Sequence, residues 1–234
     1  MKTVKFLFVL LFILSTPLQL FGRVTESAEN LLRIIHKVNR HWQENNSPQV
    51  RSFWDNAAYH TGNMEVYELT GNTAYLKYST DWAEYNHWKG AASDNKAEWR
   101  YGYGETPQYV LFGDWQCCFQ TYADLYGIRG DDRRIARARE VLEYQMGTDK
   151  NDYWWWADGL YMVMPVMTKL YRITKNPLYL EKLYEYFSYA DSVMYDPEAG
   201  LYYRDGSFVY PRHSILGGKK DFWARGDGWV LAAF

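Results

Sequence analysis

Apolar residues recur at helical spacing through much of the chain. In Glu26–Asn45 they fall on one face of a helix, at Leu31, Ile34, Ile35, Val38 and Trp42. This spacing predicts an amphipathic helix. The polar segment Asn45–Pro48 predicts where that helix ends.

Three later segments share one pattern and align without gaps, at Tyr67–Asn72, Tyr126–Asp131 and Tyr171–Asn176. Each has the pattern of a helix end, a short polar turn and the start of a second helix, which predicts a repeated αα-hairpin. Gly71 and Gly130 suit the left-handed position that ends a helix, and Pro177 suits the first turn of the next one.

An aspartate precedes each of these turns by about the length of one helix. Asp55, Asp114 and Asp158 hold these places, and Asp227 opens a fourth unit. We therefore expect an aspartate at the start of each inner helix, and a chain that stops inside a helix after about three and a half hairpins.

Repeated helical hairpins form either an open solenoid or a closed ring of inner and outer helices. Long aromatic loops at Trp88–Gly113 and Asp196–Phe222 favour the ring, in which the inner-helix starts gather at one mouth. The alternative is a complete open array of three hairpins, which the missing polar cap at the C-terminal end disfavours.

Composition points to carbohydrate rather than to nucleic acid. Aromatic residues make up 19% of the chain, with 11 Trp and 22 Tyr, and flat aromatic faces suit the C–H faces of sugars. The alternative is an aromatic core, which explains the run Trp154–Trp156 less well than single residues. The net charge of −2 gives no electrostatic case for nucleic acid or an anionic membrane.

The N-terminus has the pattern of a secretory signal peptide over residues 1–22. Lys2 and Lys5 precede the apolar run Phe6–Leu14, which is too short to span a bilayer. We expect an exported protein, periplasmic or secreted, with residues 23–234 in a single domain and no later membrane span. The neighbouring Cys117 and Cys118 are expected to be buried free thiols.

Asp158 and Asp114 are the candidate catalytic carboxyls. Asp158 lies among indoles in Trp154–Met162, and loss of hydration there raises a carboxyl pKa, whereas a helix N-terminus lowers it. Two carboxyls on neighbouring inner helices would suit general acid–base work on a glycosidic or enol-ether bond. The alternative for each aspartate is a helix cap.

The string Trp223–Trp229 is the most distinctive candidate binding segment. Arg225 offers a planar fork for a carboxylate, and Trp223 and Trp229 offer stacking faces, so a sugar acid would use all three. The alternative is an Arg225–Asp227 pair that locks the loop. His213 would bind substrate or cap a turn, and the other histidines have no metal-ligand spacing.

These residues resemble the unsaturated glucuronyl and rhamnogalacturonyl hydrolases, glycoside hydrolase families 88 and 105. The resemblance runs from about Asn30 to Phe234 and is carried by Trp156–Met162, by Trp223–Trp229, and by Asp114-Trp115-Gln116 with Gln120-Thr121-Tyr122. It implies an all-α (α/α)6 barrel, of which this chain would hold the N-terminal portion. On that basis we expect the chain alone to be poorly stable or inactive.

The resemblance also implies hydration of the C4=C5 double bond in a 4,5-unsaturated uronic acid, without metal or cofactor. Asp158 would protonate C4 and activate the water that attacks C5, and Asp114 would position substrate or water. The sugar-holding residues would be Arg225, Trp229, Trp223, His213, Trp156 and Met162. The expected substrate is an unsaturated oligosaccharide left by a lyase, with rhamnose from pectin as the first choice of neighbouring sugar.

Two other functions stay open on the sequence. One is a helical-barrel glycosidase or epimerase that acts on saturated sugars. The other is a non-catalytic carbohydrate-binding protein of the envelope that uses Trp154, Trp156 and Trp229 as platforms.

Overall fold

The computed structural model describes residues 27–234, so the predicted signal peptide lies outside the described residues and stays a prediction. The chain divides into two compact units between Ser47 and Pro48. In the first unit, residues 27–45 form the expected helix. The side chains of Leu31, Ile34 and Val38 are more than half exposed.

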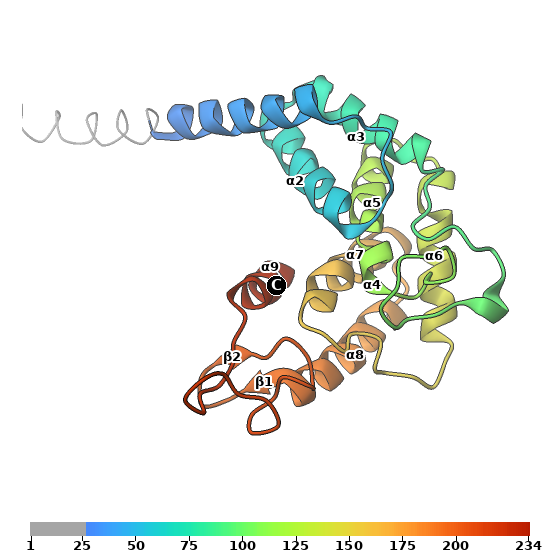
Figure 1. The fold of residues 1–234 in the computed structure, drawn as a ribbon. Coiled ribbons are helices and arrows are strands. Elements are labelled where there is room, and N and C mark those ends of the chain that lie inside the picture. The colour runs from blue at the N-terminus through green and yellow to red at the C-terminus, as the bar shows by residue number, and fades with distance from the viewer. Residues whose placement is uncertain (1–26) are drawn as a thin grey trace, which may run out of the picture. The chain divides into compact units, whose positions relative to one another are not determined.

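The regular secondary structure of the second unit is almost wholly helical (Figure 1). In chain order the elements are α2 (Trp54–Thr70), α3 (Thr73–Tyr85), the 3-10 helix η1 (Lys96–Glu98), α4 (Gly113–Gln116), α5 (Cys118–Ile128), α6 (Arg133–Met146), α7 (Asp158–Thr174), α8 (Leu178–Met194), β1 (Tyr195–Asp196), β2 (Leu201–Tyr202) and α9 (Ala224–Ala233). Within residues 27–234, no helix has both the length and the hydropathy to cross a bilayer.

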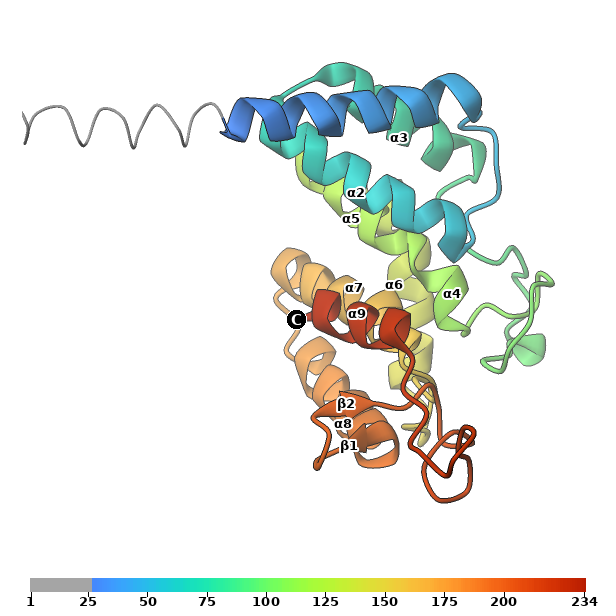
Figure 2. The same ribbon diagram turned by 60° about the vertical axis from the view of Figure 1, so that its left-hand side comes forward.

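The helices of this unit form an inner and an outer layer. The inner helices α2, α5, α7 and α9 pack side by side in sequence order, and α3, α6 and α8 cover them as the second helices of three hairpins (Figure 2). This confirms the predicted hairpins and the predicted inner position of the aspartate-bearing helices. The largest fully buried side chains are mainly aromatic and include Trp82, Trp154, Tyr122, Tyr179 and Tyr186.

The three hairpin turns share one side-chain to backbone hydrogen bond. The side chains of Asn72, Asp131 and Asn176 each accept a hydrogen bond from the backbone N–H two residues later, at 3.0, 3.1 and 3.1 Å. Each bond satisfies an amide at the start of the following helix, which the preceding turn cannot satisfy. The equivalence of these residues in the sequence alignment therefore has a structural basis.

The left-handed residues at these turns only partly match the prediction. Gly71 is left-handed with φ 66°, as expected, and Pro177 leads directly into α8 with a helical φ of −64°. The prediction for Gly130 is wrong, because α5 ends earlier, at Ile128, through an extended Arg129. In the third turn Lys175 takes the left-handed position, with φ 59°.

The inner segment that begins near Asp114 divides into the short α4 and the longer α5. Cys117 between them keeps helical angles, φ −52° and ψ −38°, so the chain continues in the helical direction. Cys117 and Cys118 are both free and fully buried, as the sequence predicts. They fill the contact between this inner segment and its neighbours.

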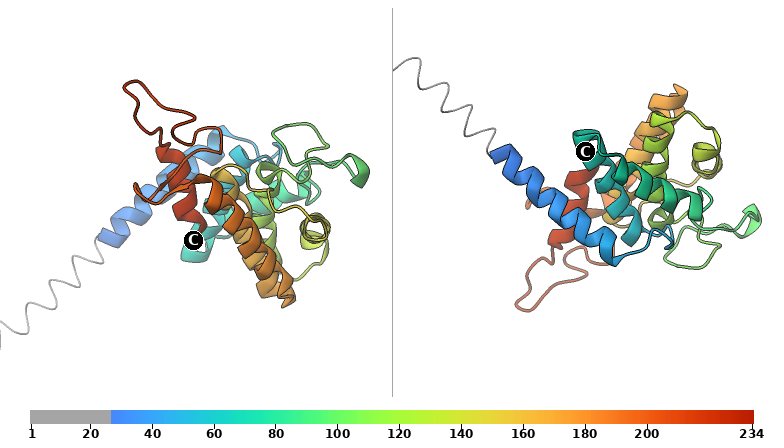
Figure 3. Two further views of the ribbon diagram at one scale, coloured as in Figure 1. Left: turned by 90° about the horizontal axis from the view of Figure 1, so that it is seen from below. Right: turned by 90° about the horizontal axis from the view of Figure 1, so that it is seen from above.

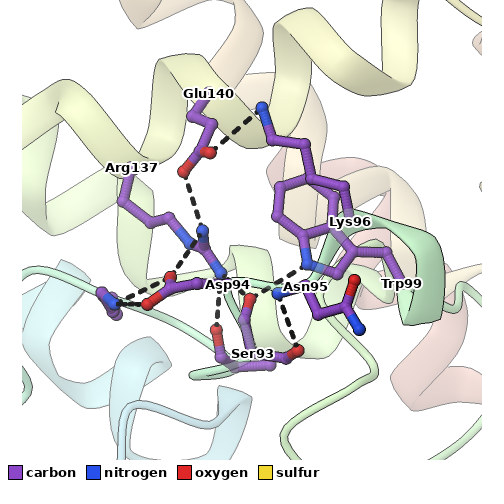
Figure 4. Close-up of polar contacts among 9 residues, drawn as sticks. Ser93, Asp94, Asn95, Lys96, Trp99, Arg137 and Glu140 are labelled. Atoms are coloured by element: carbon purple, nitrogen blue, oxygen red, sulfur yellow. Dashed lines mark hydrogen bonds and ion pairs between the residues drawn. The ribbon is translucent and has the colours of Figure 1, made fainter.

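The loop of residues 88–113 is fastened to α6 by one buried cation, Arg137 (Figure 4). The Arg137 guanidinium donates to the carbonyl oxygens of Ala91 and Ser93 and pairs with Glu140 at 2.7 Å. It also lies over the Trp99 ring, 4.9 Å from the ring centroid. Because only 5% of the Arg137 side chain is exposed, each of these partners replaces water that it has lost.

The loop of residues 196–222 is closed at its base. Asp196 accepts hydrogen bonds from the Tyr203 hydroxyl at 2.6 Å and pairs with Lys220 at 2.7 Å, which joins the two ends of the loop. Asp227 in α9 accepts from the backbone N–H of Tyr202 at 2.8 Å. Figure 3 shows the loop projecting beside the start of α9.

The anchoring role of Arg137 is testable by substitution. We expect Arg137→Met to lower the free energy of unfolding by about 2–3 kcal/mol, because the substitution leaves buried carbonyl oxygens without donors. Urea-induced unfolding measures the change. Arg139→Met on the same helix removes only an exposed pair with Glu143 and should cost about 0.5 kcal/mol or less. Equal effects of the two variants would contradict the anchoring role.

Candidate active site

All four aspartates stand in the first turn of an inner-layer helix. Asp55 lies in α2, Asp114 in α4, Asp158 in α7 and Asp227 in α9. None of these helices is capped by a side chain, since the residue before each helix is apolar: Phe53, Phe112, Ala157 and Trp223. The aspartates are therefore not N-cap residues, although Asp55 accepts the backbone N–H of Asn56 at 3.0 Å in the first turn of α2.

Trp156 brings the starts of α4 and α7 together. A side-chain carbon added at Gly113 would lie 3.0 Å from the Trp156 ring, and one added at Gly159 would lie 3.1 Å from it. The indole is thus held between two glycines, each next to an aspartate, Asp114 or Asp158. A side-chain carbon at either position would force the indole to shift by a few tenths of an ångström, so glycine favours this close approach.

Asp114 is the more strongly perturbed of the two carboxyls. Its side chain is buried, and this loss of hydration raises its pKa to about 8. Repulsion from Asp158, then Glu105, then Asp55 adds to the shift. Glu105 is held in place by Arg51, at 2.5 Å. Asp114 therefore carries a proton at neutral pH.

Asp158 is also buried, and burial raises its pKa, but three groups oppose the shift. These are its own backbone N–H and the positive charges of Arg225 and Arg204. Its Oδ2 atom has no hydrogen-bond partner among the described residues, so this oxygen can still form a hydrogen bond. The sequence left open whether burial or the helix N-terminus dominates at Asp158, and burial does, because the pKa of Asp158 is raised. With two cations nearby, that rise is smaller than the one at Asp114.

A cavity of about 390 Å³ opens beside the start of α9. It is lined by Arg204, Phe208, Asp221, Phe222, Trp223 and Arg225. The guanidinium of Arg225 lies over the Trp223 ring, 4.4 Å from the ring centroid. The predicted arginine and the first tryptophan of the string therefore come together at one cavity.

Asp227 does not pair with Arg225. Its carboxylate accepts from the Tyr202 backbone instead, and Arg225 has no ion pair within residues 27–234. The alternative of an Arg225–Asp227 pair is therefore wrong: Asp227 fastens the backbone of Tyr202 to α9 instead, and Arg225 keeps its guanidinium available for a ligand.

His213 does not line the cavity but contacts two residues that do. Its Nε2 is 2.7 Å from the carboxylate of Asp221, and its ring packs 4.6 Å from the ring of Phe208. Both Asp221 and Phe208 line the cavity, so His213 supports two lining residues. Direct contact between His213 and a substrate stays a prediction.

The other predicted binding residues lie deeper or elsewhere. Trp229 packs 4.6 Å from Tyr161 and 6.4 Å from Trp54, on the inner helices, and its Nε1 is buried without a partner among the described residues. Met162 is 1% exposed and fills the core beneath Gly113. Trp154 is also 1% exposed, so its ring offers no platform to a sugar.

Two charged residues near this site were missed by the sequence reasoning. Arg204 is brought to the start of α7 because its carbonyl oxygen accepts from the Ala157 N–H at 2.9 Å. Glu105 reaches Asp114 through the loop of residues 88–113, whose Gly104 carbonyl accepts from the Trp115 indole at 3.2 Å. Both contacts join distant segments, so neither local pattern nor spacing could indicate them.

Gln120 completes helix α7 at a break that Pro165 creates. Pro165 has no N–H, so the carbonyl oxygen of Tyr161, four residues earlier, loses its helical donor. The Gln120 side chain of α5 donates to that oxygen at 2.8 Å. This bond fastens α5 to α7 one turn below Asp158.

A double-mutant cycle tests this compensation. Gln120→Leu should lower the free energy of unfolding by about 1–3 kcal/mol, because it leaves a buried carbonyl unpaired. In a Pro165→Ala background the new N–H can serve the Tyr161 carbonyl, so the same substitution should cost about 1 kcal/mol less. An identical cost in both backgrounds, measured by urea unfolding, would refute the compensation.

The raised pKa of Asp114 makes stability depend on pH. Its folded pKa, about 8, lies above its unfolded value of 3.8, so its contribution is fully present below about pH 4 and is lost as the pH rises toward 8. We expect Asp114→Asn to make the fall in the free energy of unfolding with rising pH less steep, by up to about 1.4 kcal/mol per pH unit. Unfolding curves recorded between about pH 5 and pH 8 measure this change, because that interval lies between the unfolded and the folded pKa of Asp114.

The exposed Asp149 provides the matched control for this measurement. Asp149→Asn should leave the slope of stability against pH as it is in the unmodified protein. An unchanged slope in Asp114→Asn would show that Asp114 does not hold the proton.

No cluster of three or more potential metal ligands occurs among the residues that the structure describes. The inner and outer layers of hairpins, with paired carboxyls at the inner-helix starts, define a protein of the helical-hairpin class. The chain belongs to glycosyl hydrolase family 88, whose sequence profile matches residues 28–234.

Similar proteins agree with this class. An "Unsaturated 3S-rhamnoglycuronyl hydrolase" from Formosa agariphila is 27% identical over 188 residues, which are 76% of this chain and 48% of that protein. A solved structure named "Glycosyl hydrolase family 88 from Bacteroides vulgatus" is 69% identical, with a TM-score of 0.86, and covers 88% of this chain and 59% of its own.

A second solved structure, named as a polysaccharide lyase, is 70% identical, with a TM-score of 0.86 over 88% of this chain and 58% of its own. The chain thus spans about half to three fifths of the length of these similar proteins.

Proposed function

We propose that this protein acts in removing a 4,5-unsaturated uronic acid from the non-reducing end of an oligosaccharide, by hydration of the C4=C5 bond. The observation that carries the proposal is a pair of buried carboxyls, Asp114 and Asp158, next to a cavity that holds Arg225 and Trp223. Membership of family 88 and the name of the Formosa agariphila relative support it.

The reaction needs a proton donor, an activated water and a partner for the sugar's carboxylate. The proton goes to C4 and the water oxygen bonds to C5, after which the resulting hemiketal opens and releases the remaining sugar. Asp158, whose pKa is raised by burial and whose Oδ2 has no partner, is the transfer group: in its protonated form it gives the proton to C4, and the carboxylate that results then accepts a proton from the water.

Asp114 has the complementary role in this mechanism. Because its pKa is raised to about 8, it stays protonated at neutral pH and donates a hydrogen bond to the substrate or to the water. Arg225 pairs with the uronate carboxylate, while Trp223 offers its ring to the sugar. All of these residues act through their own side chains.

We propose rhamnose as the sugar next to the unsaturated uronate. The relative's name, a rhamnoglycuronyl hydrolase, supports this choice. An origin of that rhamnose in pectin rests on the sequence resemblance alone.

The second candidate function is a lyase, favoured by the 70% identical structure that is named as one. A lyase removes the C5 proton of a saturated uronide and expels the C4 substituent, so it creates the double bond that a hydrolase consumes. The same side chains suit both reactions: an arginine beside the carboxylate acidifies C5, one carboxyl acts as the base and the other protonates the leaving group.

Ultraviolet absorbance of the conjugated double bond separates the two reactions. On lyase-generated unsaturated rhamnosyl disaccharides, the longest form of the protein that its gene encodes should lower this absorbance. Asp158→Asn should reduce the rate by about 10²–10⁴-fold, because it removes the proton-transfer group. The exposed Asp149→Asn variant should keep the full rate.

A rise in absorbance on saturated uronides, with no loss on unsaturated ones, would overturn the hydrolase proposal in favour of the lyase. Turnover without any absorbance change on saturated oligosaccharides would point to an ordinary glycosidase.

A further inference from the structure

Two arginines meet at one aromatic ring in the cavity beside α9. The guanidinium of Arg225 lies 4.4 Å from the Trp223 ring centroid, and that of Arg204 lies 6.0 Å from the same centroid. Both residues line the cavity, and both act on the charge of Asp158. The carboxylate partner already assigned needs only one of them.

The backbone fixes Arg204 at this place. Its carbonyl oxygen accepts from the Ala157 N–H at 2.9 Å, and the next residue, Asp205, forms an isolated β-bridge with Trp156. The loop is thereby joined to the segment just before Asp158. The Arg204 side chain is nevertheless 55% exposed, so its guanidinium is accessible to a ligand.

Among the described residues, the two guanidiniums form one ion pair with a carboxylate, a long contact between Arg204 Nε and Asp205 Oδ2. Asp221 is engaged by His213 at 2.7 Å. Asp205 approaches the Arg204 Nε only to 3.8 Å and accepts the backbone N–H of Ser207 at 2.8 Å. Asp227 is committed to the Tyr202 backbone. The cavity therefore presents two guanidiniums at one indole, and both act on the charge of Asp158.

We propose that Arg204 is a second anion-binding residue of the substrate site, which holds one sugar carboxylate together with Arg225 while the sugar ring lies on Trp223. The inference rests on the proposed function for the identity of the anion, a uronate. Two guanidiniums beside one ring would bind the same carboxylate. They would fix its orientation better than a single arginine does.

The arrangement explains how the site selects sugar acids. A neutral sugar can stack on Trp223 but leaves both guanidiniums without a partner, so it gains only the stacking energy. A uronate satisfies both cations. Its carboxylate also restrains the ring beside Asp158, because Arg204 is joined through Ala157 to the segment that precedes Asp158.

Direct binding of D-glucuronate tests the inference without any turnover. In the longest form of the protein that its gene encodes, titration would be followed by tryptophan fluorescence and by the NMR signals of the arginine Nε–H groups. We expect glucuronate to bind at least about 10-fold more tightly than glucose, and Arg204→Gln to weaken glucuronate binding by about 10-fold while leaving glucose binding unchanged.

The variant Arg225→Gln and the double variant show whether one carboxylate is shared. If both arginines hold the same group, the loss in the double variant is smaller than the product of the single losses. Arg212→Gln is the matched control, because Arg212 belongs to the same loop, donates to the Gly206 carbonyl and lines a different cavity. It should leave glucuronate binding unchanged.

Failure to bind glucuronate, an effect of Arg204→Gln of less than about 2-fold, or an equal effect on glucose would overturn the inference. So would independent, multiplicative losses in the double variant. Because binding is measured without turnover, a protein that binds glucuronate as expected but leaves the unsaturated disaccharide unchanged would contradict the proposed function and leave this inference standing.

Discussion

Loss of hydration at two neighbouring carboxyl groups, to which repulsion adds at Asp114, is the constraint on which this site depends. Asp114 and Asp158 are both more than nine-tenths buried, at the starts of adjacent helices. Because water cannot screen them, they do not both ionise readily, and the pair keeps a proton at neutral pH. The same strain that makes this arrangement costly for folding makes it useful for acid–base chemistry.

The surrounding structure sets how the two groups differ. Glu105, brought by a loop that Arg137 fastens to α6, adds negative charge on the side of Asp114. Arg204 and Arg225 add positive charge on the side of Asp158. The difference between the two carboxyls is therefore set partly by the backbone N–H at the start of α7 and partly by segments distant in the chain.

Features that depend on local pattern could be predicted from the sequence. The hairpins follow from helical periodicity and from polar turns such as Thr70-Gly71-Asn72, and the aspartates follow from their place before each turn. Local pattern failed at Gly130, because the chain there ends its helix through an extended Arg129 and needs no left-handed residue. The Trp154–Trp156 run predicts an aromatic surface that binds sugar, whereas Trp154 belongs to the core.

Features that depend on long-range contact could not be predicted. The position of Arg204 follows from a backbone bond to Ala157, and the role of Gln120 follows from a proline in another helix. The structure does bring the predicted Asp158 and Asp114 near each other, and the predicted Arg225 and Trp223 to one cavity, while their roles stay predictions. What the structure adds is the division of labour among them, in which Asp114 holds the proton more tightly than Asp158 does.

The most direct test of this division is the carbon-13 NMR titration of the Asp114 carboxyl, in the unmodified protein and in Asp158→Asn. The account predicts a pKa of about 8 in the unmodified protein, and a clearly lower value in the variant, because the repulsion from Asp158 is then absent. A pKa for Asp114 near the ordinary 3.8 in the unmodified protein, or one that does not respond to Asp158→Asn, would contradict the shared-proton site.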